Sequence, residues 1–170
     1  MKNEKENNKK GSGQAGIALR LKLLTAFIAL AGAVFFGGCT YNLIRNKLYF
    51  EKYGISCTPL LIMVGITAIL CYAVLWQFWK VCTQIGRENY FSIENHFSFR
   101  VMSGLFLILA AAWVVGAIVY LFLAERLDYI ILFKIVELII IWLVAAGLTG
   151  ALAKLIDKAR QIREENDLTI

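Results

Sequence analysis

Four long apolar blocks constrain this chain more than any other feature. They contain 22, 27, 24 and 25 residues between flanking charges, and only the fourth holds charged residues of its own, Lys134 and Glu137. About 20 apolar residues are enough to cross a bilayer as an α-helix. The blocks therefore predict an all-α membrane protein with four transmembrane helices, at about residues 21–44, 57–79, 100–124 and 129–153.

The overall composition supports burial in lipid. Hydrophobic residues make up 59% of the 170 residues and charged residues 18%, against roughly 45–50% and 25% in soluble domains. A soluble domain of this size would have too few polar residues to cover its surface. Residues 1–16 are polar and contain glycine, which predicts a disordered tail ahead of the transmembrane domain at 17–153.

The distribution of positive charge predicts the orientation. Of the 18 lysines and arginines, 13 lie in the N-terminal tail, in the connection between the second and third blocks, and in the C-terminal segment. Lysine and arginine accumulate on the cytoplasmic side of membrane proteins. We therefore expect a multi-pass protein of the cell membrane with both termini cytoplasmic (N-in, C-in). Because the net charge of +6 is explained in this way, the sequence does not favour direct binding of nucleic acid.

Residues 154–170 continue the last helix beyond the membrane as a cytoplasmic extension with an acidic tail. Apolar residues recur along one stripe of this amphipathic helix, and basic residues occupy the rest. Two interpretations remain open. The extension rests on anionic lipid headgroups, or it forms a docking surface for a cytoplasmic partner. The stripe consists of Leu152, Leu155, Ile156, Ala159 and Ile162.

The four cysteines lack the spacing of metal ligands, so no metal or cofactor is expected. Cys39 ends a sequence that is similar to a lipoprotein signal, but Phe36 is a poor substitute for the aliphatic residue usual at that position, so a retained helix is preferred to lipidation. A disulfide between Cys39 and Cys57 is an alternative on the outer side. Small residues at Ala33 and Gly37, Ala112 and Gly116, and in the range 146–151 predict close helix contacts.

Lys134 and Glu137 are the candidate functional residues inside the membrane. Three residues apart, they share one helix face and can form an ion pair. The preferred interpretation is an internal pair that faces the other helices rather than lipid, with the Lys134 side chain snorkelling outward. The alternative is that Glu137 lines a pathway for an ion, a proton or a substrate. No nucleotide-binding loop, metal cluster or nucleophile motif is present, so an enzyme is not expected.

The connection Gly86 to Arg100 carries the most distinctive sequence, GRENYFSIENHFSFR. Ser92 is a good N-cap, and Glu94 would lie in the first turn of a helix that starts at Ile93 and runs into the third span. The lone His96 is expected to pack or to contact headgroups.

Two motifs carry a resemblance to a known family. Asn89, Phe91, Ser92, Glu94, Asn95 and Arg100 match a recurring pattern at this connection, and the C-terminal EENDLTI, with Glu165, Asp167, Leu168 and Thr169, matches a second. The chain thereby resembles the bacterial membrane-protein family called domain of unknown function 2975. The resemblance implies four spans and no assigned activity. It also implies a cytoplasmic partner such as a small helix-turn-helix transcription regulator.

Two functional hypotheses follow from these observations. The first is a non-enzymatic membrane protein that recruits or sequesters a cytoplasmic partner through the residues of the two motifs. The second is a small transporter, channel or immunity-type protein that uses Glu137, for which a homo-oligomer would have to enclose the pathway.

Overall fold

Four long helices form the part of the chain that the structure describes. The computed structural model describes residues 2–48, 57–87, 92–123 and 129–167, and side chains within 16–48, 57–87, 92–122 and 129–166. Each helix contains a stretch long and apolar enough to cross a membrane, so the prediction of an all-α chain with four candidate spans is confirmed. The helices are α1 (Lys2–Arg45), α3 (Cys57–Gly86), α4 (Ile93–Leu123) and α5 (Tyr129–Asp167).

The helix starts agree well with the sequence, whereas two helices extend further than predicted. Helices α3, α4 and α5 begin at Cys57, Ile93 and Tyr129 as expected. Helix α3 continues past the predicted end of its span to Gly86, a residue type that commonly terminates helices. Helix α1 includes residues 2–16, which were expected to be disordered. Lysine and glutamate side chains four residues apart favour a helix there.

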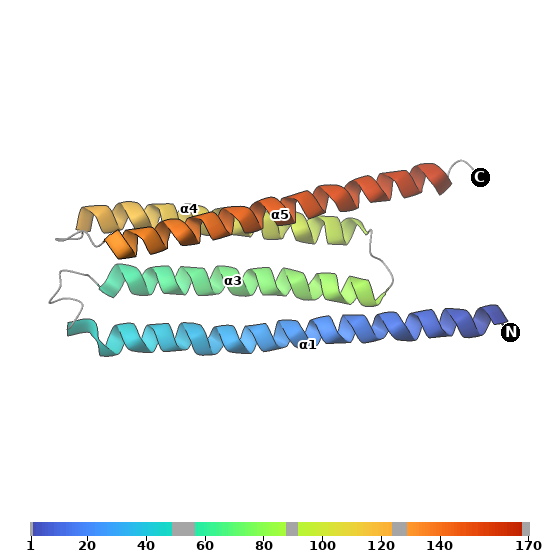
Figure 1. The fold of residues 1–170 in the computed structure, drawn as a ribbon, viewed down its shortest axis with the longest axis horizontal. Helices are drawn as coiled ribbons and strands as arrows, with labels where there is room; N and C mark the ends of the chain where they lie inside the picture. The colour runs from blue at the N-terminus through green and yellow to red at the C-terminus, as the bar shows by residue number, and fades with distance from the viewer. Residues whose placement is uncertain (1, 49–56, 88–91, 124–128, 168–170) are drawn as a thin grey trace.

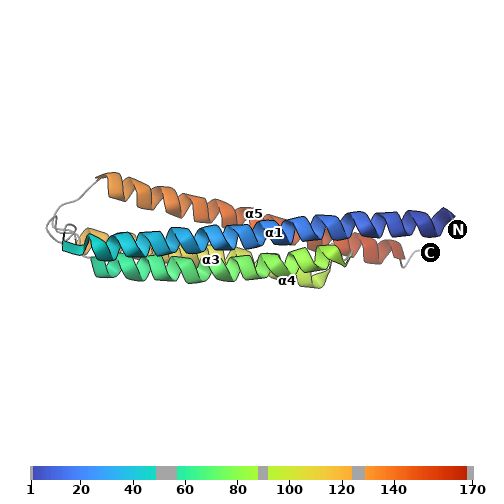
Figure 2. The ribbon, with the colours of Figure 1, turned by 90° about the horizontal axis from the view of Figure 1, so that it is seen from below.

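The helices pack in chain order. Extensive contacts join α1 to α3, α3 to α4, and α4 to α5, with the last pair in the closest association. Figure 1 shows neighbouring helices running in opposite directions, with both termini at the same end of the molecule. We call this end the termini end. Figure 2 shows that α5 is tilted relative to the other helices. The antiparallel pairing of α4 and α5 agrees with the short connection between them.

Small residues allow α4 and α5 to approach closely. Ala146 is buried, and a side-chain carbon at Gly150 would lie 3.1 Å from Ser103 Oγ of α4. The Ser103 hydroxyl donates a hydrogen bond to the Ala146 carbonyl at 2.8 Å. By contrast, Gly147 has no neighbouring atoms within 4 Å of such a carbon. The predicted cluster in 146–151 therefore divides into a packed side and an open side.

The other two predicted small-residue pairs have different outcomes. A carbon added to Gly116 would lie 2.9 Å from the Met63 side chain, so α3 and α4 do approach closely there. A carbon added to Gly37 would meet nothing within 4 Å. The close helix contact predicted at Ala33 and Gly37 is therefore wrong for contacts inside one copy of the chain. Helix α1 instead meets α3 near Gly32, where the Tyr72 hydroxyl of α3 donates to the Ala29 carbonyl at 2.7 Å.

Candidate functional site

The second half of the distinctive connection is a well-capped helix start. The Ser92 Oγ accepts a hydrogen bond from the Asn95 backbone N–H at 3.2 Å, and the Ser92 carbonyl accepts one from the His96 N–H, also at 3.2 Å. This is the geometry of an N-cap. Glu94 lies in the first turn, where its negative charge favours the helix dipole. The predicted capping role of Ser92 is therefore confirmed.

The first turns of α4 pack against α5 through polar side chains. Asn95 and Ser98 are 2% and 5% exposed, so both belong to the interior of the fold. His96 Nδ1 lies 2.9 Å from the Ala153 carbonyl oxygen of α5. Because a carbonyl only accepts, Nδ1 must carry the proton in this contact. The burial of Asn95 gives it a packing role, and His96 has the packing role expected of it.

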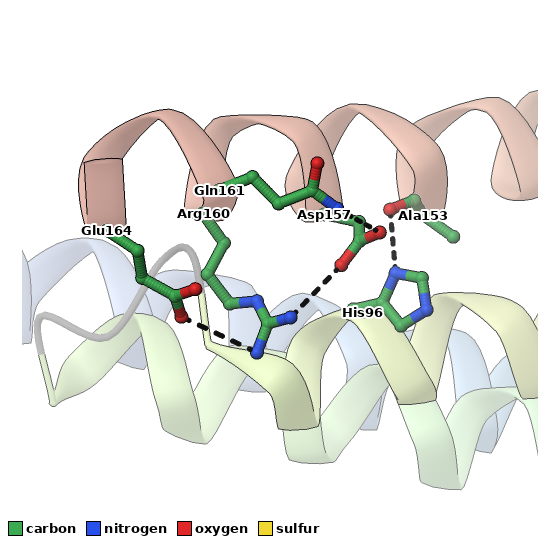
Figure 3. A network of polar contacts seen from close by, with 6 residues as sticks. All are labelled: His96, Ala153, Asp157, Arg160, Gln161 and Glu164. Carbon is green, nitrogen blue, oxygen red and sulfur yellow. Dashed lines mark hydrogen bonds and ion pairs between the residues drawn. The ribbon is translucent and has the colours of Figure 1, made fainter. Parts of the chain in front are cut away.

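A polar network continues from this contact along α5 (Figure 3). Arg160 contacts Asp157 at 3.4 Å and Glu164 at 3.7 Å, and Gln161 donates to Asp157 at 3.2 Å. The side chains of Asp157 and Arg160 are only 36% and 31% exposed. The half-buried side of this helix segment therefore combines these charged side chains with Ile156 and Ala159, and its charges are largely matched within the segment.

The last part of α5 projects beyond the start of α4. We call residues 154–167 the α5 arm. The contact between His96 and Ala153 sets the register: α4 begins three residues from His96, whereas α5 continues to Asp167. At 1.5 Å per residue, α5 extends about 16 Å further than the start of α4. Figure 1 shows this overhang at the termini end.

The outward side of the α5 arm is partly apolar. Leu155 and Ile162 are 63% and 50% exposed, although they are large hydrophobic residues outside the predicted span. Exposed apolar residues on a helix mark an interaction surface when they form a continuous patch. Leu152 is also exposed, at 45%, and Ala159 between them is half-buried. Three members of the predicted stripe therefore face outward, whereas Ile156 and Ala159 are half-buried.

Several residues of the predicted partner surface cannot be placed. Asn89, Phe91, Leu168 and Thr169 lie outside the described residues, and the structure includes Asp167 only as the last residue of α5. Arg100 and Glu165 are exposed. Among the described members of the predicted surface, Ser92 and Glu94 lie at the start of α4, and Glu165 lies on the α5 arm, all at the termini end. Asn95 lies at the start of α4 as well, but because it is only 2% exposed it does not form part of a surface that a partner could contact.

Lys134 and Glu137 form the predicted ion pair, but it faces the opposite way. Lys134 Nζ lies 2.7 Å from Glu137 Oε2, and the two side chains are 65% and 45% exposed. The pair therefore points outward from the four helices, contrary to the expectation that it would face them. The register explains this difference, because Ile135, between the two, occupies the side of α5 that packs inward and is 8% exposed.

The cysteines show no sign of the alternative disulfide. Cys39 and Cys57 are free, and Cys57 is buried at 2% exposure. Cys57 Sγ instead lies 3.9 Å from the Lys47 carbonyl. Cys39 lies within the continuous helix α1.

A cavity that the sequence did not reveal lies between the end of α3 and the start of α4. Its volume is about 530 Å³, and its lining combines apolar with charged and polar side chains. Residues 77–84 of α3 and 93–98 of α4 contribute to it. The only signal in the sequence was the position of Lys80, the first charge after an apolar block. Predicting the cavity also requires the register between the two helices.

The family model described as protein of unknown function (DUF2975) matches residues 17–170. Neither the comparison with curated proteins nor the comparison with solved structures found a match. The match includes all four candidate spans and both motifs that suggested the resemblance. This chain of four long apolar helices, with a capped start to α4 and a projecting last helix, therefore belongs to the DUF2975 family of proteins of unknown function.

Proposed function

We propose that this protein is a non-enzymatic, multi-pass protein of the cell membrane that recruits or sequesters a cytoplasmic partner at the termini end. The α5 arm is the docking surface, and both termini are cytoplasmic. The single observation that carries the proposal is the exposure of Leu155 and Ile162 on a helix that projects beyond the start of α4, the helix it packs against. The family resemblance suggests a small helix-turn-helix regulator as the partner.

The geometry of α5 favours a water-soluble partner over the membrane surface. A helix that lies on headgroups runs in the plane of the membrane, whereas α5 is one continuous helix of 39 residues. Such a helix is about 58 Å long, roughly twice the thickness of the hydrocarbon core. Its last turns therefore leave the membrane along the direction of the span. The apolar side of the arm is then available to a helix or groove of another protein.

The charge distribution supports the same assignment. Lys154, Lys158 and Arg163 are exposed on the arm, while Arg160 is engaged with Asp157 and Glu164. The arm thus presents an apolar stripe flanked by positive charge. A partner with an apolar groove and an acidic rim would match this surface, since opposite charges at the rim of an interface speed association and select the partner.

Co-purification of the full chain from mild detergent tests the proposal. The double variant Leu155→Ser with Ile162→Ser should release the associated protein, and so should removal of residues 164–170. Lys158→Ser on the same arm is the matched control, with a smaller effect expected from the loss of one exposed charge. If both the double variant and the truncated chain retain every associated cytoplasmic protein, the assignment of the docking surface is wrong.

A polarity-sensitive fluorophore on the arm separates the two interpretations of its apolar side. It is attached at Ile162→Cys in a chain whose four native cysteines are replaced by alanine, and the chain is reconstituted without a partner. We expect the emission of a probe in water. Emission typical of a lipid environment would instead place the arm on the membrane surface.

The second hypothesis, in which Glu137 lines a transport pathway, is tested by a separate experiment. The carboxylate is engaged by Lys134, and neither side chain lines the cavity between α3 and α4 or the one beside Val34, Leu60 and Trp113. Flux in liposomes by wild type, abolished in Glu137→Gln, would favour it over recruitment.

A further inference from the structure

The cavity between α3 and α4 is separate from the α5 arm, because no described residue of α5 lines it. Its volume of about 530 Å³ falls within the roughly 300–1,000 Å³ of small-molecule sites. The side chains that line it come from the end of one candidate span and the start of the next, because α3 ends at Gly86 and α4 begins at Ile93. The cavity is therefore at the level where hydrocarbon meets headgroups.

The polar part of the cavity presents both signs of charge. Lys80 and Glu94 both line it, and no ion pair joins them among the described residues. The Gln84 amide donates a hydrogen bond to Glu94 Oε2, which fixes the carboxylate at the mouth of the groove. The second carboxylate oxygen, Oε1, remains available as an acceptor. A ligand with one cationic and one anionic group could satisfy both side chains at once.

The rest of the lining is apolar and open to the surroundings. Ile93 and Phe97 are 61% and 63% exposed, one turn apart on α4, and Trp79 is 40% exposed on α3. The Trp79 ring is also held by Lys22 of α1, whose Nζ lies 5.4 Å from the ring centroid. Tryptophan is enriched at membrane interfaces because its ring combines an apolar body with a polar N–H. These side chains suit the glycerol region and upper acyl chain of a lipid.

We propose that this cavity binds a phospholipid with an ethanolamine headgroup. The Lys80 ammonium binds the phosphate, and Glu94 accepts hydrogen bonds from the primary ammonium of the headgroup. Trp79, Ile93 and Phe97 pack against the glycerol backbone and the start of an acyl chain. A glycerol headgroup would also place its phosphate at Lys80, but its neutral hydroxyls would leave the Glu94 charge without a cation to balance it. A choline headgroup would carry the positive charge but offer no N–H donor.

Native mass spectrometry of the full-length protein tests this assignment. The protein is reconstituted in vesicles containing equal amounts of phosphatidylethanolamine, phosphatidylcholine and phosphatidylglycerol, and is then released with its retained lipids. We expect one retained phosphatidylethanolamine, favoured over each of the other two by about tenfold, as loss of a hydrogen bond to a charged group implies. Equal retention of the three lipids, or preference for phosphatidylglycerol, would overturn the proposal.

Substitutions of Glu94 and Lys80 test the separate contributions of the two side chains to lipid binding. Glu94→Gln should remove the preference for ethanolamine over choline, while Lys80→Gln should weaken retention of all three lipids. Lys80→Arg keeps the charge and should retain the lipid, and Lys158→Gln on the α5 arm is the matched control. Circular dichroism of each variant shows whether the helices are intact. An unchanged lipid preference in a folded Glu94→Gln protein would show that the carboxylate does not discriminate between headgroups.

The readout is independent of the proposed function. Release of a cytoplasmic partner depends on Leu155 and Ile162, whereas lipid retention depends on Lys80 and Glu94. Failure of one experiment therefore leaves the other unaffected.

Discussion

Replacing Gly150 by alanine should loosen the contact between α4 and α5, whereas the same change at Gly147 should not. The added carbon at Gly150 would lie 3.1 Å from Ser103 Oγ and 3.8 Å from its Cβ. The Ser103 hydroxyl is fixed by its hydrogen bond to the Ala146 carbonyl at 2.8 Å. The serine must therefore turn away and lose this bond, or the two helices must separate by a few tenths of an ångström.

The magnitude follows from the two contributions. An interhelical hydrogen bond in a membrane protein contributes about 0.6 kcal/mol on average, and overpacking a close contact costs about 1–3 kcal/mol. Both variants replace glycine by alanine inside α5, so the gain in helix propensity is similar in each and cancels in the comparison. The Gly150→Ala protein should then be about 0.6–3 kcal/mol less stable than the Gly147→Ala protein, the lower value if the serine turns away and the higher if the helices are overpacked.

Unfolding in mixed micelles by increasing fractions of sodium dodecyl sulfate, followed by circular dichroism, measures this difference. The variant Ser103→Ala with Gly150→Ala is the companion test, because it removes the hydroxyl that the new methyl group meets. Much of the lost stability should return in the double variant. Equal stability of the two single glycine variants would refute the register of α4 on α5, and with it the position of the α5 arm.

Three further changes test other contacts. Ser92→Ala removes the N-cap of α4 and should lower the free energy of unfolding by about 1 kcal/mol in the same assay, with Ser92→Asp restoring it; no loss would show that the cap is not needed. His96→Ala breaks the contact with the Ala153 carbonyl, and exchange of amide hydrogens at the start of α4 should become faster; unchanged exchange would contradict a role in fastening α4 to α5. Lys134→Gln and Glu137→Gln should each reduce the yield of membrane-inserted protein by leaving one charge unmatched, and the double variant should recover part of it. Additive losses in the double variant would show that the two side chains do not stabilise each other.

The spans and the start of α4 could be predicted because their causes are local. The length of an apolar block decides whether a helix can cross a bilayer, and a serine before a helix can cap it without any information from elsewhere. Ser92 and Ile93 illustrate this: the predicted cap and the predicted start both appear in the structure.

The faces of the helices could not be predicted in the same way. In a membrane both lipid and protein accept apolar side chains, so hydrophobicity does not distinguish the packed side from the lipid-facing side. Gly37 and Gly150 have similar sequence contexts, yet only Gly150 meets another helix. The outward direction of Lys134 and the cavity beside Lys80 depend on the same tertiary register.

The packing of the helices in chain order has a consequence for how the protein is made. Each extensive interface joins two helices that follow each other in the sequence. Contacts between sequence neighbours require little loop-closure entropy and form quickly. During synthesis, α1 can pair with α3 as soon as both have left the ribosome, and α4 can then add to the exposed side of α3. Helix α5 completes the molecule last, so a chain that stops before Tyr129 should still insert as a three-helix intermediate with the α5-binding side of α4 uncovered.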